Sequence, residues 1–226
     1  MVFFNFKKKN SEVQLAKAGI PVILVLLFLS IILIIGARFT KGIVLPIFVV
    51  LTWLMLLFSI YFFRDPNRNT PDQENAIISP ADGKIIVIEE TIEQSFFKEK
   101  VRKVSIFMSV FNVHVNRIPI DGSVVHYDYK KGKFYPAYKD DAAFENEQTT
   151  IGIENKNIKI LFKQIAGIMA RRIVCNVHEG MNVKKGERFG MIKFGSRIDL
   201  FLPLNVQLQI ELGQKVKAGE TIIGLY

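Results

Sequence analysis

The residues with the clearest chemical potential are Gly195 and Ser196, which stand between two apolar runs, residues 189–194 and 200–204. Glycine has no Cβ, so its carbonyl can be approached from either face and can sit in strained backbone geometry. A hydroxyl on the next residue can attack that carbonyl and convert the amide into an ester. Elimination then splits the chain and leaves a dehydroalanine, which hydrolyses to a pyruvoyl group. The dipeptide therefore allows self-cleavage, although a tight Gly-Ser turn is the simpler interpretation.

Ser196 is also a candidate nucleophile for a Ser-His-Asp hydrolase. The nucleophile elbow of such enzymes reads Gly-x-Ser-x-Gly, and here no glycine follows the serine, so a hydrolase is disfavoured. The three histidines are scattered and lack the spacing of metal ligands, so we expect no metal site. The single cysteine, Cys175, excludes an internal disulfide and is interpreted as a small buried hydrophobe.

Two other side chains are candidates for proton transfer. Asp82 belongs to an Asp-Gly pair, which by itself is typical of a hairpin turn. His114 lies in a strand-like apolar run, 112–115, where a buried structural histidine is the simpler interpretation, but an imidazole also suits proton transfer at neutral pH. The remaining histidines, His126 and His178, have no such context and are interpreted as structural or surface residues.

Four stretches together resemble one enzyme family. The Phe-Gly-Ser-Arg stretch at 194–197 resembles the self-cleavage motif of phosphatidylserine decarboxylases of the short prokaryotic type. Three further stretches occur in the order of that family, and the resemblance covers residues 60–226. They are Ser-Pro-Ala-Asp-Gly-Lys at 79–84, Phe-Asn-Val-His-Val-Asn-Arg at 111–117, and Gly-Lys-Phe at 132–134 with Glu-Asn-Glu at 145–147.

The resemblance implies a proenzyme that cleaves itself between Gly195 and Ser196. The products are a β chain, residues 1–195, and an α chain, residues 196–226, which form a heterodimer that can assemble further. The α chain begins with a pyruvoyl group made from Ser196. Its carbonyl forms a Schiff base with the amine of membrane phosphatidylserine and accepts the electrons released with carbon dioxide, which yields phosphatidylethanolamine. Asp82 is implied as a general base in self-cleavage, and His114 as a group that handles the substrate carboxylate or delivers the proton.

The sequence departs from the family pattern at one position. Longer members carry two histidines three residues apart before a proline, and the second belongs to an Asp-His-Ser relay. Counting back from Pro119, His114 matches the first histidine and Arg117 takes the place of the second. A complete relay of Asp82, His114 and Ser196 is therefore in question, and His114 is assigned to decarboxylation instead.

The composition points to a membrane. A net charge of +9 and a pI of 9.6 fit nucleic acid or an anionic membrane surface equally well, but 50% of the residues are hydrophobic and the mean hydropathy is +0.25. The excess lies in two apolar runs, 18–37 and 43–63, each long enough to cross a bilayer core of about 30 Å as a helix. We predict a two-helix membrane hairpin over residues 1–63 and no nucleic-acid partner. A signal peptide or a buried helix pair is the alternative.

Basic residues around the two runs predict the orientation. The positive-inside bias places both ends of the hairpin, and with them the remaining chain, on the cytoplasmic side of the inner membrane. The outer flanks carry Lys7, Lys8, Lys9, Lys17, Arg64 and Arg68, and the connection carries Arg38 and Lys41.

The rest of the chain predicts a mainly β domain. Residues 64–75 are polar and proline-marked, which indicates a linker. From 76 to 226, short strand-like runs alternate with turns. The pattern Val-Lys-x-Gly-Glu occurs twice, at 183–187 and 216–220, and resembles the hammerhead turn of lipoyl- and biotinyl-type domains. We therefore expect a barrel-sandwich-like fold, without the prosthetic lysine of those domains.

Two other functions remain open from the sequence. A non-enzymatic membrane adaptor with a barrel-sandwich domain would share the anchor and the repeated turn, but it would not need Gly-Ser at a strand junction. A decarboxylase of another serine phospholipid, such as the archaeal ether analogue archaetidylserine, would need the same residues as a phosphatidylserine decarboxylase.

Overall fold

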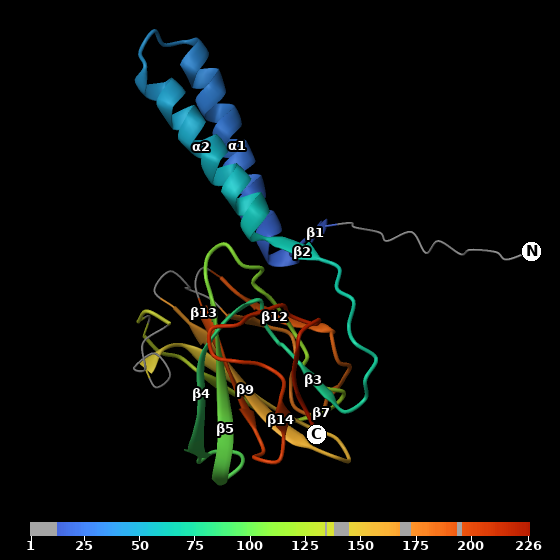
Figure 1. Ribbon diagram of the computed structural model, residues 1–226. Helices are drawn as coiled ribbons and strands as arrows, with labels where there is room; N and C mark the ends of the chain where they lie inside the picture. Colours follow the sequence, from blue (N-terminus) through green and yellow to red (C-terminus); the bar gives the residue numbers. More distant parts are fainter. Residues whose placement is uncertain (1–12, 134, 138–144, 168–172, 194–195) are drawn as a thin grey trace, which may run out of the picture. The chain divides into compact units, whose positions relative to one another are not determined.

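The computed structural model describes residues 13–133, 135–137, 145–167, 173–193 and 196–226. Gly195, half of the expected cleavage site, lies outside the described residues. The chain divides into two units, Met1–Asn67 and Arg68–Tyr226, and each is described by itself (Figure 1).

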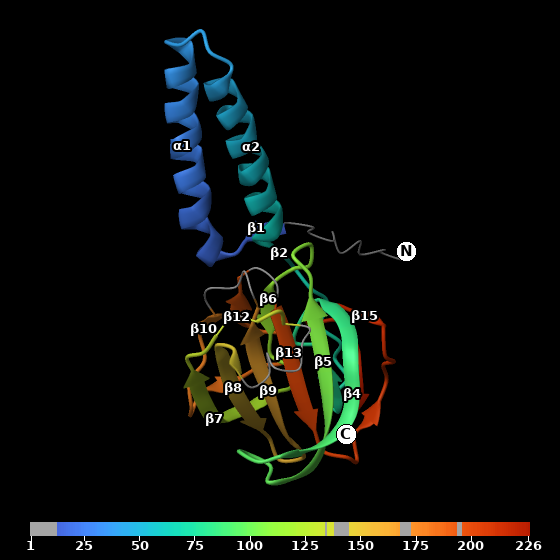
Figure 2. The ribbon, with the colours of Figure 1, turned by 90° about the vertical axis from the view of Figure 1, so that its left-hand side faces the viewer.

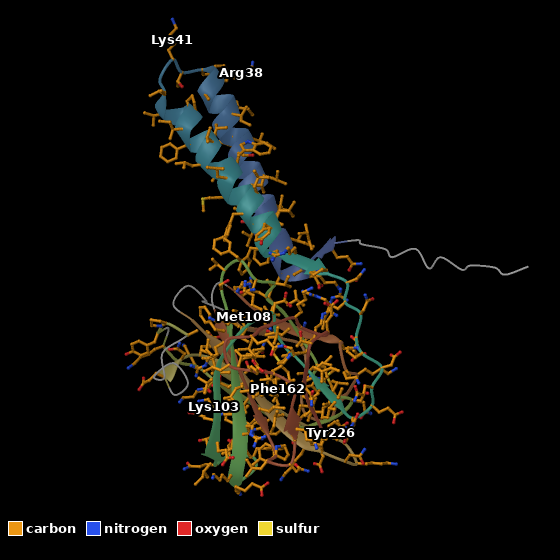
Figure 3. All side chains as sticks on the ribbon, in the orientation of Figure 1. Arg38, Lys41, Lys103, Met108, Phe162 and Tyr226 are labelled. Carbon is orange, nitrogen blue, oxygen red and sulfur yellow. The ribbon has the colours of Figure 1, made fainter. Side chains whose placement is uncertain are left out.

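The N-terminal unit is a pair of helices tied together by a short two-stranded sheet. Strand β1 (Val13–Leu15) pairs antiparallel with β2 (Arg64–Pro66), and a 3₁₀ turn, η1 (Lys17–Gly19), leads into helix α1 (Ile20–Arg38). Pro21 stands in the first turn of α1, where its missing N–H breaks no helical hydrogen bond. Helix α2 (Val44–Phe62) returns antiparallel, and Arg38 and Lys41 lie where the two helices are joined (Figure 3).

Three of the six buried residues in the two helices carry a hydroxyl. Ser30, Thr52 and Ser59 are buried, and the hydroxyls of Ser30 and Thr52 donate to the Leu27 and Phe48 carbonyls at 2.8 Å. Small interfacial residues with internally satisfied hydroxyls are typical of helices that pack in lipid. Most of the large apolar side chains face outward instead. The structure therefore has two helices long and apolar enough to cross a membrane.

The second unit is built on an antiparallel sheet of eight strands. Its strands are β4 (Gly83–Glu93), β5 (Glu99–Met108), β7 (Gly122–Lys130), β8 (Gln148–Glu154), β9 (Lys159–Ala166), β11 (Asn182–Val183), β13 (Ser196–Leu202) and β15 (Lys215–Val216). Their order is β11-β7-β8-β9-β13-β5-β4-β15, so β13 is central although it comes late in the chain. Figure 2 shows the central strands side by side.

Two three-stranded sheets complete this unit. One has the order β10-β12-β6, formed by Ile173–Cys175, Arg188–Ile192 and Val115–Arg117. The other has the order β14-β16-β3, formed by Gln207–Leu208, Ile222–Leu225 and Ala76–Ile78. The second unit is thus mainly β, as predicted, and the predicted helix pair precedes it.

One face of the large sheet forms the core. Side chains alternate along a strand, so Ile198, Leu200 and Leu202 of β13 point inward while the residues between them point outward. The inner face meets the small sheets, and the rings of Phe162 and Phe189 cross edge to face with centroids 5.2 Å apart.

The repeated sequence pattern has a repeated structure. Gly186 and Gly219 have φ angles of +85° and +77°, a backbone region that glycine tolerates best. Their amides donate to the carbonyls of Ile118 and Ser79, respectively, at 2.8 and 2.9 Å. The valines of the two patterns pair with Gly122 of β7 and Gly83 of β4. The unit therefore contains two copies of one turn, as the barrel-sandwich-like prediction requires.

Candidate active site

Ser196 is the first residue of the central strand β13 and is fully buried. Across the strands it lies opposite Met108 on β5 and Ala166 on β9. Ser196 lies two residues before Ile198, which faces the core, and side chains alternate along a strand. The side chain of Ser196 therefore lies on the core side of the sheet. Ser196 is thus buried from solvent at one end of the sheet.

A small buried polar network surrounds the Ser196 hydroxyl. Ser196 Oγ donates to Met108 Sδ at 3.2 Å, and Asn116 Nδ2 lies 3.9 Å from the same sulfur. Gln164 Nε2 in turn donates to Asn116 Oδ1 at 2.9 Å. A thioether is a weak acceptor, so the serine hydroxyl is oriented without being strongly bound.

Sequence reasoning assigned no role to Met108, Asn116 or Gln164. Gln164 carried a usable signal, because it stands between Phe162 and Ala166 at a core-facing position where a polar side chain needs a reason. Its Oε1 atom is buried and has no hydrogen-bond partner among the residues that the structure describes.

His114 is fully buried and lies just before β6, not within a strand over 112–115 as predicted. The reason is Asn112, whose Oδ1 accepts from the Ser109 amide and hydroxyl at 2.9 and 2.7 Å and so forms a turn. His114 Nδ1 lies 3.0 Å from the Asn112 carbonyl. This contact assigns the proton to Nδ1, which makes Nε2 the basic nitrogen of the neutral ring.

Asp82 is nearly buried and accepts three hydrogen bonds. Nη2 of Arg68 donates to both of its carboxylate oxygens, at 2.9 and 2.7 Å, and the Ala218 amide donates to Oδ1 at 2.8 Å. Nη1 of Arg68 also lies 3.5 Å from Oε2 of Glu220. Arg68 falls in the segment predicted as a linker, and its role could not be read from the local sequence.

Arg117, which takes the place of the second family histidine, is nearly buried on β6. Its Nη1 donates to the Gly186 carbonyl at 2.9 Å, and its backbone amide donates to the Pro80 carbonyl at 3.0 Å. The second bond joins the 79–84 and 111–117 stretches directly. The side chain supports the repeated turn described above.

The remaining motif pair also converges on this end of the sheet. Lys133 pairs with Asn146 in an isolated bridge, which joins the Gly-Lys-Phe stretch to the Glu-Asn-Glu stretch. The side-chain amide of Asn146 donates to the backbone carbonyl of Ala166 at 2.7 Å, and Ala166 is the cross-strand neighbour of Ser196. Segments that are distant in sequence are thus brought to the start of β13.

The other titratable candidates lie elsewhere. His126 on β7 packs against the ring of Phe96 with centroids 5.7 Å apart, and His178 is exposed. Burial raises the pKa of the Cys175 thiol, which suits the predicted inert role. Within the described part of the chain, no cluster of histidine, cysteine, aspartate or glutamate could hold a metal ion.

Comparison with known proteins gives a consistent result. The family model described as phosphatidylserine decarboxylase matches residues 55–224. The chain is 51% identical over 172 residues to the phosphatidylserine decarboxylase proenzyme of Chlorobium phaeobacteroides, covering 76% of this chain and 81% of the relative. It is 42% identical over 213 residues to that of Chlorobium limicola, covering 94% and 100%, and 43% identical over 219 residues to that of Geobacter metallireducens, covering 96% and 99%. The chain belongs to the phosphatidylserine decarboxylase family, and it is a decarboxylase of phospholipid biosynthesis.

Proposed function

We propose that this chain is a proenzyme that cleaves itself between Gly195 and Ser196 and then decarboxylates phosphatidylserine. The observation that carries the proposal is the setting of Ser196, which is the first residue of the central strand and whose buried hydroxyl donates to the thioether of Met108. Oγ attacks the Gly195 carbonyl and the amide becomes an ester. Elimination breaks the Cβ–Oγ bond and frees residues 1–195 with a C-terminal carboxylate. Water then displaces ammonia from residue 196 and leaves the pyruvoyl group.

The surroundings of Ser196 fit such a group. The site is buried, and Gln164 Oε1, which has no hydrogen-bond partner among the described residues, supplies a buried acceptor on the neighbouring strand. When present, the group supplies a carbonyl that condenses with the substrate amine and draws electrons as carbon dioxide leaves. The protein groups that would orient it are Met108, Asn116 and Gln164.

His114 is proposed to act on the substrate, not on self-cleavage. Its Nδ1–H is donated to the Asn112 carbonyl, so Nε2 carries the lone pair that can bind or move a proton. Asp82 is proposed as the base of self-cleavage. Its hydrogen bonds with Arg68 and Ala218 also give it a structural part, which the experiments below separate from the catalytic one.

The helix pair is proposed to anchor the enzyme in the inner membrane, with residues 68–226 in the cytoplasm. A diacyl substrate then remains in the bilayer while its headgroup reaches the domain. The two apolar helices support the anchor, and the basic residues at their flanks support the orientation.

The test is the mass of the purified protein. Wild-type protein should separate into two chains that break after Gly195, and the smaller chain should be lighter than the peptide 196–226 by one ammonia. Cyanoborohydride with phosphatidylserine should attach the lipid to that smaller chain alone. Ser196→Ala should remain one inactive chain, whereas Ser105→Ala, a buried serine on the adjacent strand, should be processed normally. A wild-type preparation that remains a single chain with no carbonyl would overturn the proposal.

A further inference from the structure

A cavity lies on the face of the large sheet that is turned away from the core. Its volume is about 620 Å³, within the range of small-molecule sites. Its wall includes His126, Asp128, Lys130, Thr150, Lys163 and Asp199. Asp199 shares β13 with Ser196, but the two side chains lie on opposite faces because residues an odd number of positions apart alternate. The cavity is therefore separate from the site around Ser196.

Strand register gives the cavity a polar floor. Asp128, Thr150, Lys163 and Asp199 pair in one continuous row across β7, β8, β9 and β13. Strands in a sheet lie about 4.8 Å apart, so neighbouring side chains of this row are in reach of one small ligand. Thr150 and Asp199 are nearly buried.

The tip of the β4–β5 hairpin bounds one end of the cavity. Phe96 at this tip packs against His126, and a Cβ on Gly152 would lie 2.8 Å from its ring. The carboxylate of Glu93 accepts hydrogen bonds from the amides of residues 95–97. Burial raises the pKa of Glu93, but the hydrogen bonds from Ser95 and these amides outweigh it, so the pKa falls below its usual value. The wall is thus a fixed structure.

The wall carries three lysines, Lys103, Lys130 and Lys163, and three carboxylates, Glu93, Asp128 and Asp199, so the partner of each charge decides which ligand the cavity favours. Asp199 is paired with Arg197, whose Nε and Nη2 lie 2.8 and 3.0 Å from its two oxygens. Lys103, also on the wall, is paired with Glu89 at 2.9 Å. Lys163 has its ammonium 5.3 Å from the centre of the Phe201 ring, and no carboxylate of the described residues lies within ion-pair distance of it. An ammonium in a recess without a carboxylate partner favours an anionic ligand.

We propose that this cavity binds a phosphate monoester dianion, with the phosphate on Lys163 and Lys130 and with Thr150 as a hydroxyl donor. The two lysines stand on different strands, at adjacent rows of the same face. The shared chemistry fits a soluble sugar- or glycerol-type phosphate and the headgroup of a lipid with a terminal phosphate. The proposal concerns binding alone and does not depend on the self-cleavage proposed above.

The test is calorimetry on the full chain in detergent. Glycerol 3-phosphate represents the soluble source, and dihexanoyl phosphatidic acid below its micelle concentration represents the lipid headgroup. At least one of them should bind with a Kd below about 1 mM, and binding should weaken as salt rises. The ligand that binds more tightly identifies the source.

Lys163→Gln should weaken binding by about tenfold or more, and Lys163→Arg should restore it to within about threefold. Lys156→Gln is the matched control, because it removes the same charge from the exposed turn before β9 and should change the Kd by less than about twofold. Lys130→Gln, at an exposed position, replaces Lys163→Gln if the latter does not fold. No binding of either ligand at about 10 mM, or equal losses in Lys163→Gln and Lys156→Gln, would refute the site.

Discussion

The two copies of the repeated turn solve the same structural problem in different surroundings. In the first, Asp82 accepts the amide of Ala218, and in the second, Asp121 accepts the amide of Lys185, both at 2.8 Å. The glycine after each aspartate starts a long strand and pairs with the valine of the repeated pattern. The segments even exchange bonds, because Ile78 donates to the Pro119 carbonyl and Arg117 donates to the Pro80 carbonyl, both at 3.0 Å.

The difference between the copies lies in what surrounds the aspartate. Asp82 is nearly buried and forms an ion pair with Arg68, whereas Asp121 is exposed. Met108 lies beside the first turn and faces Ser196. The equivalent position beside the second turn is occupied by Asn155, which donates to the Asp121 carbonyl. The amide bond common to both copies is therefore structural, and any chemistry specific to Asp82 depends on its burial, on Arg68 and on the strand that leads to Ser196.

The largest expected effect concerns the residues that precede β6 and β3. His114→Ala should lower turnover of the processed enzyme by about 10²–10⁴-fold, the usual contribution of a proton-transfer group. Asn75, which stands before β3 as His114 stands before β6, is exposed, and Asn75→Ala should leave turnover unchanged. Released carbon dioxide measures turnover and gel electrophoresis measures processing. Unchanged turnover in His114→Ala would make the histidine a core residue only.

The two aspartates give the next contrast. Asp82→Asn should reduce stability by about 3 kcal/mol, because it removes the nearer of the two carboxylates that pair with the nearly buried Arg68, and should slow self-cleavage. Asp121→Asn keeps an acceptor at an exposed turn and should cost less than about 1 kcal/mol. Thermal unfolding in detergent measures stability, and the time course of chain separation measures processing. Arg68→Gln separates the structural role of Asp82 from its catalytic role. If Arg68→Gln destabilises the protein but leaves self-cleavage fast, loss of stability alone does not account for slow self-cleavage in Asp82→Asn.

The glycines test what the copies share. A Cβ on Gly83 would lie 2.3 Å from the Phe107 carbonyl oxygen, and one on Gly122 would lie 2.4 Å from that of Glu154. Gly83→Ala and Gly122→Ala should therefore destabilise the protein by similar amounts, about 1–3 kcal/mol each. Unfolding midpoints of the two variants should agree. A large loss in one variant alone would show that the copies are not structurally equivalent.

The smallest expected effect is at Met108. Met108→Leu keeps the volume and should change stability by less than about 1.5 kcal/mol. It removes the sulfur that orients Ser196 Oγ, so we expect self-cleavage to slow by about threefold to tenfold. The appearance of residues 196–226 by mass spectrometry measures the rate. Ile106→Leu, a volume-conserving change on the same strand and face, should leave the rate unchanged.

Features that depend on neighbouring residues were predictable from the sequence. Two long apolar runs define the helix pair to within two residues at each end, because about 20 consecutive apolar residues suffice to span a bilayer. The repeated Val-Lys-x-Gly-Glu pattern predicted a repeated turn, because a positive φ selects glycine locally. The prediction of a strand over 112–115 is wrong, because the Asn112 side chain accepts a hydrogen bond from Ser109 and forms a turn, and Ser109 lies outside that run.

Long-range partners were decided by the tertiary structure alone. Ser196 lies 88 positions from Met108, and Asp82 lies 136 positions from Ala218, so no local spacing encodes either contact. Antiparallel register brings them together, and register follows from packing a whole face of the sheet. The sequence by itself determined the two long apolar helices and the β class of the domain. Only the fold determined that the serine faces a thioether, that the aspartate binds an arginine, and that the opposite face of the same strand lines a cavity.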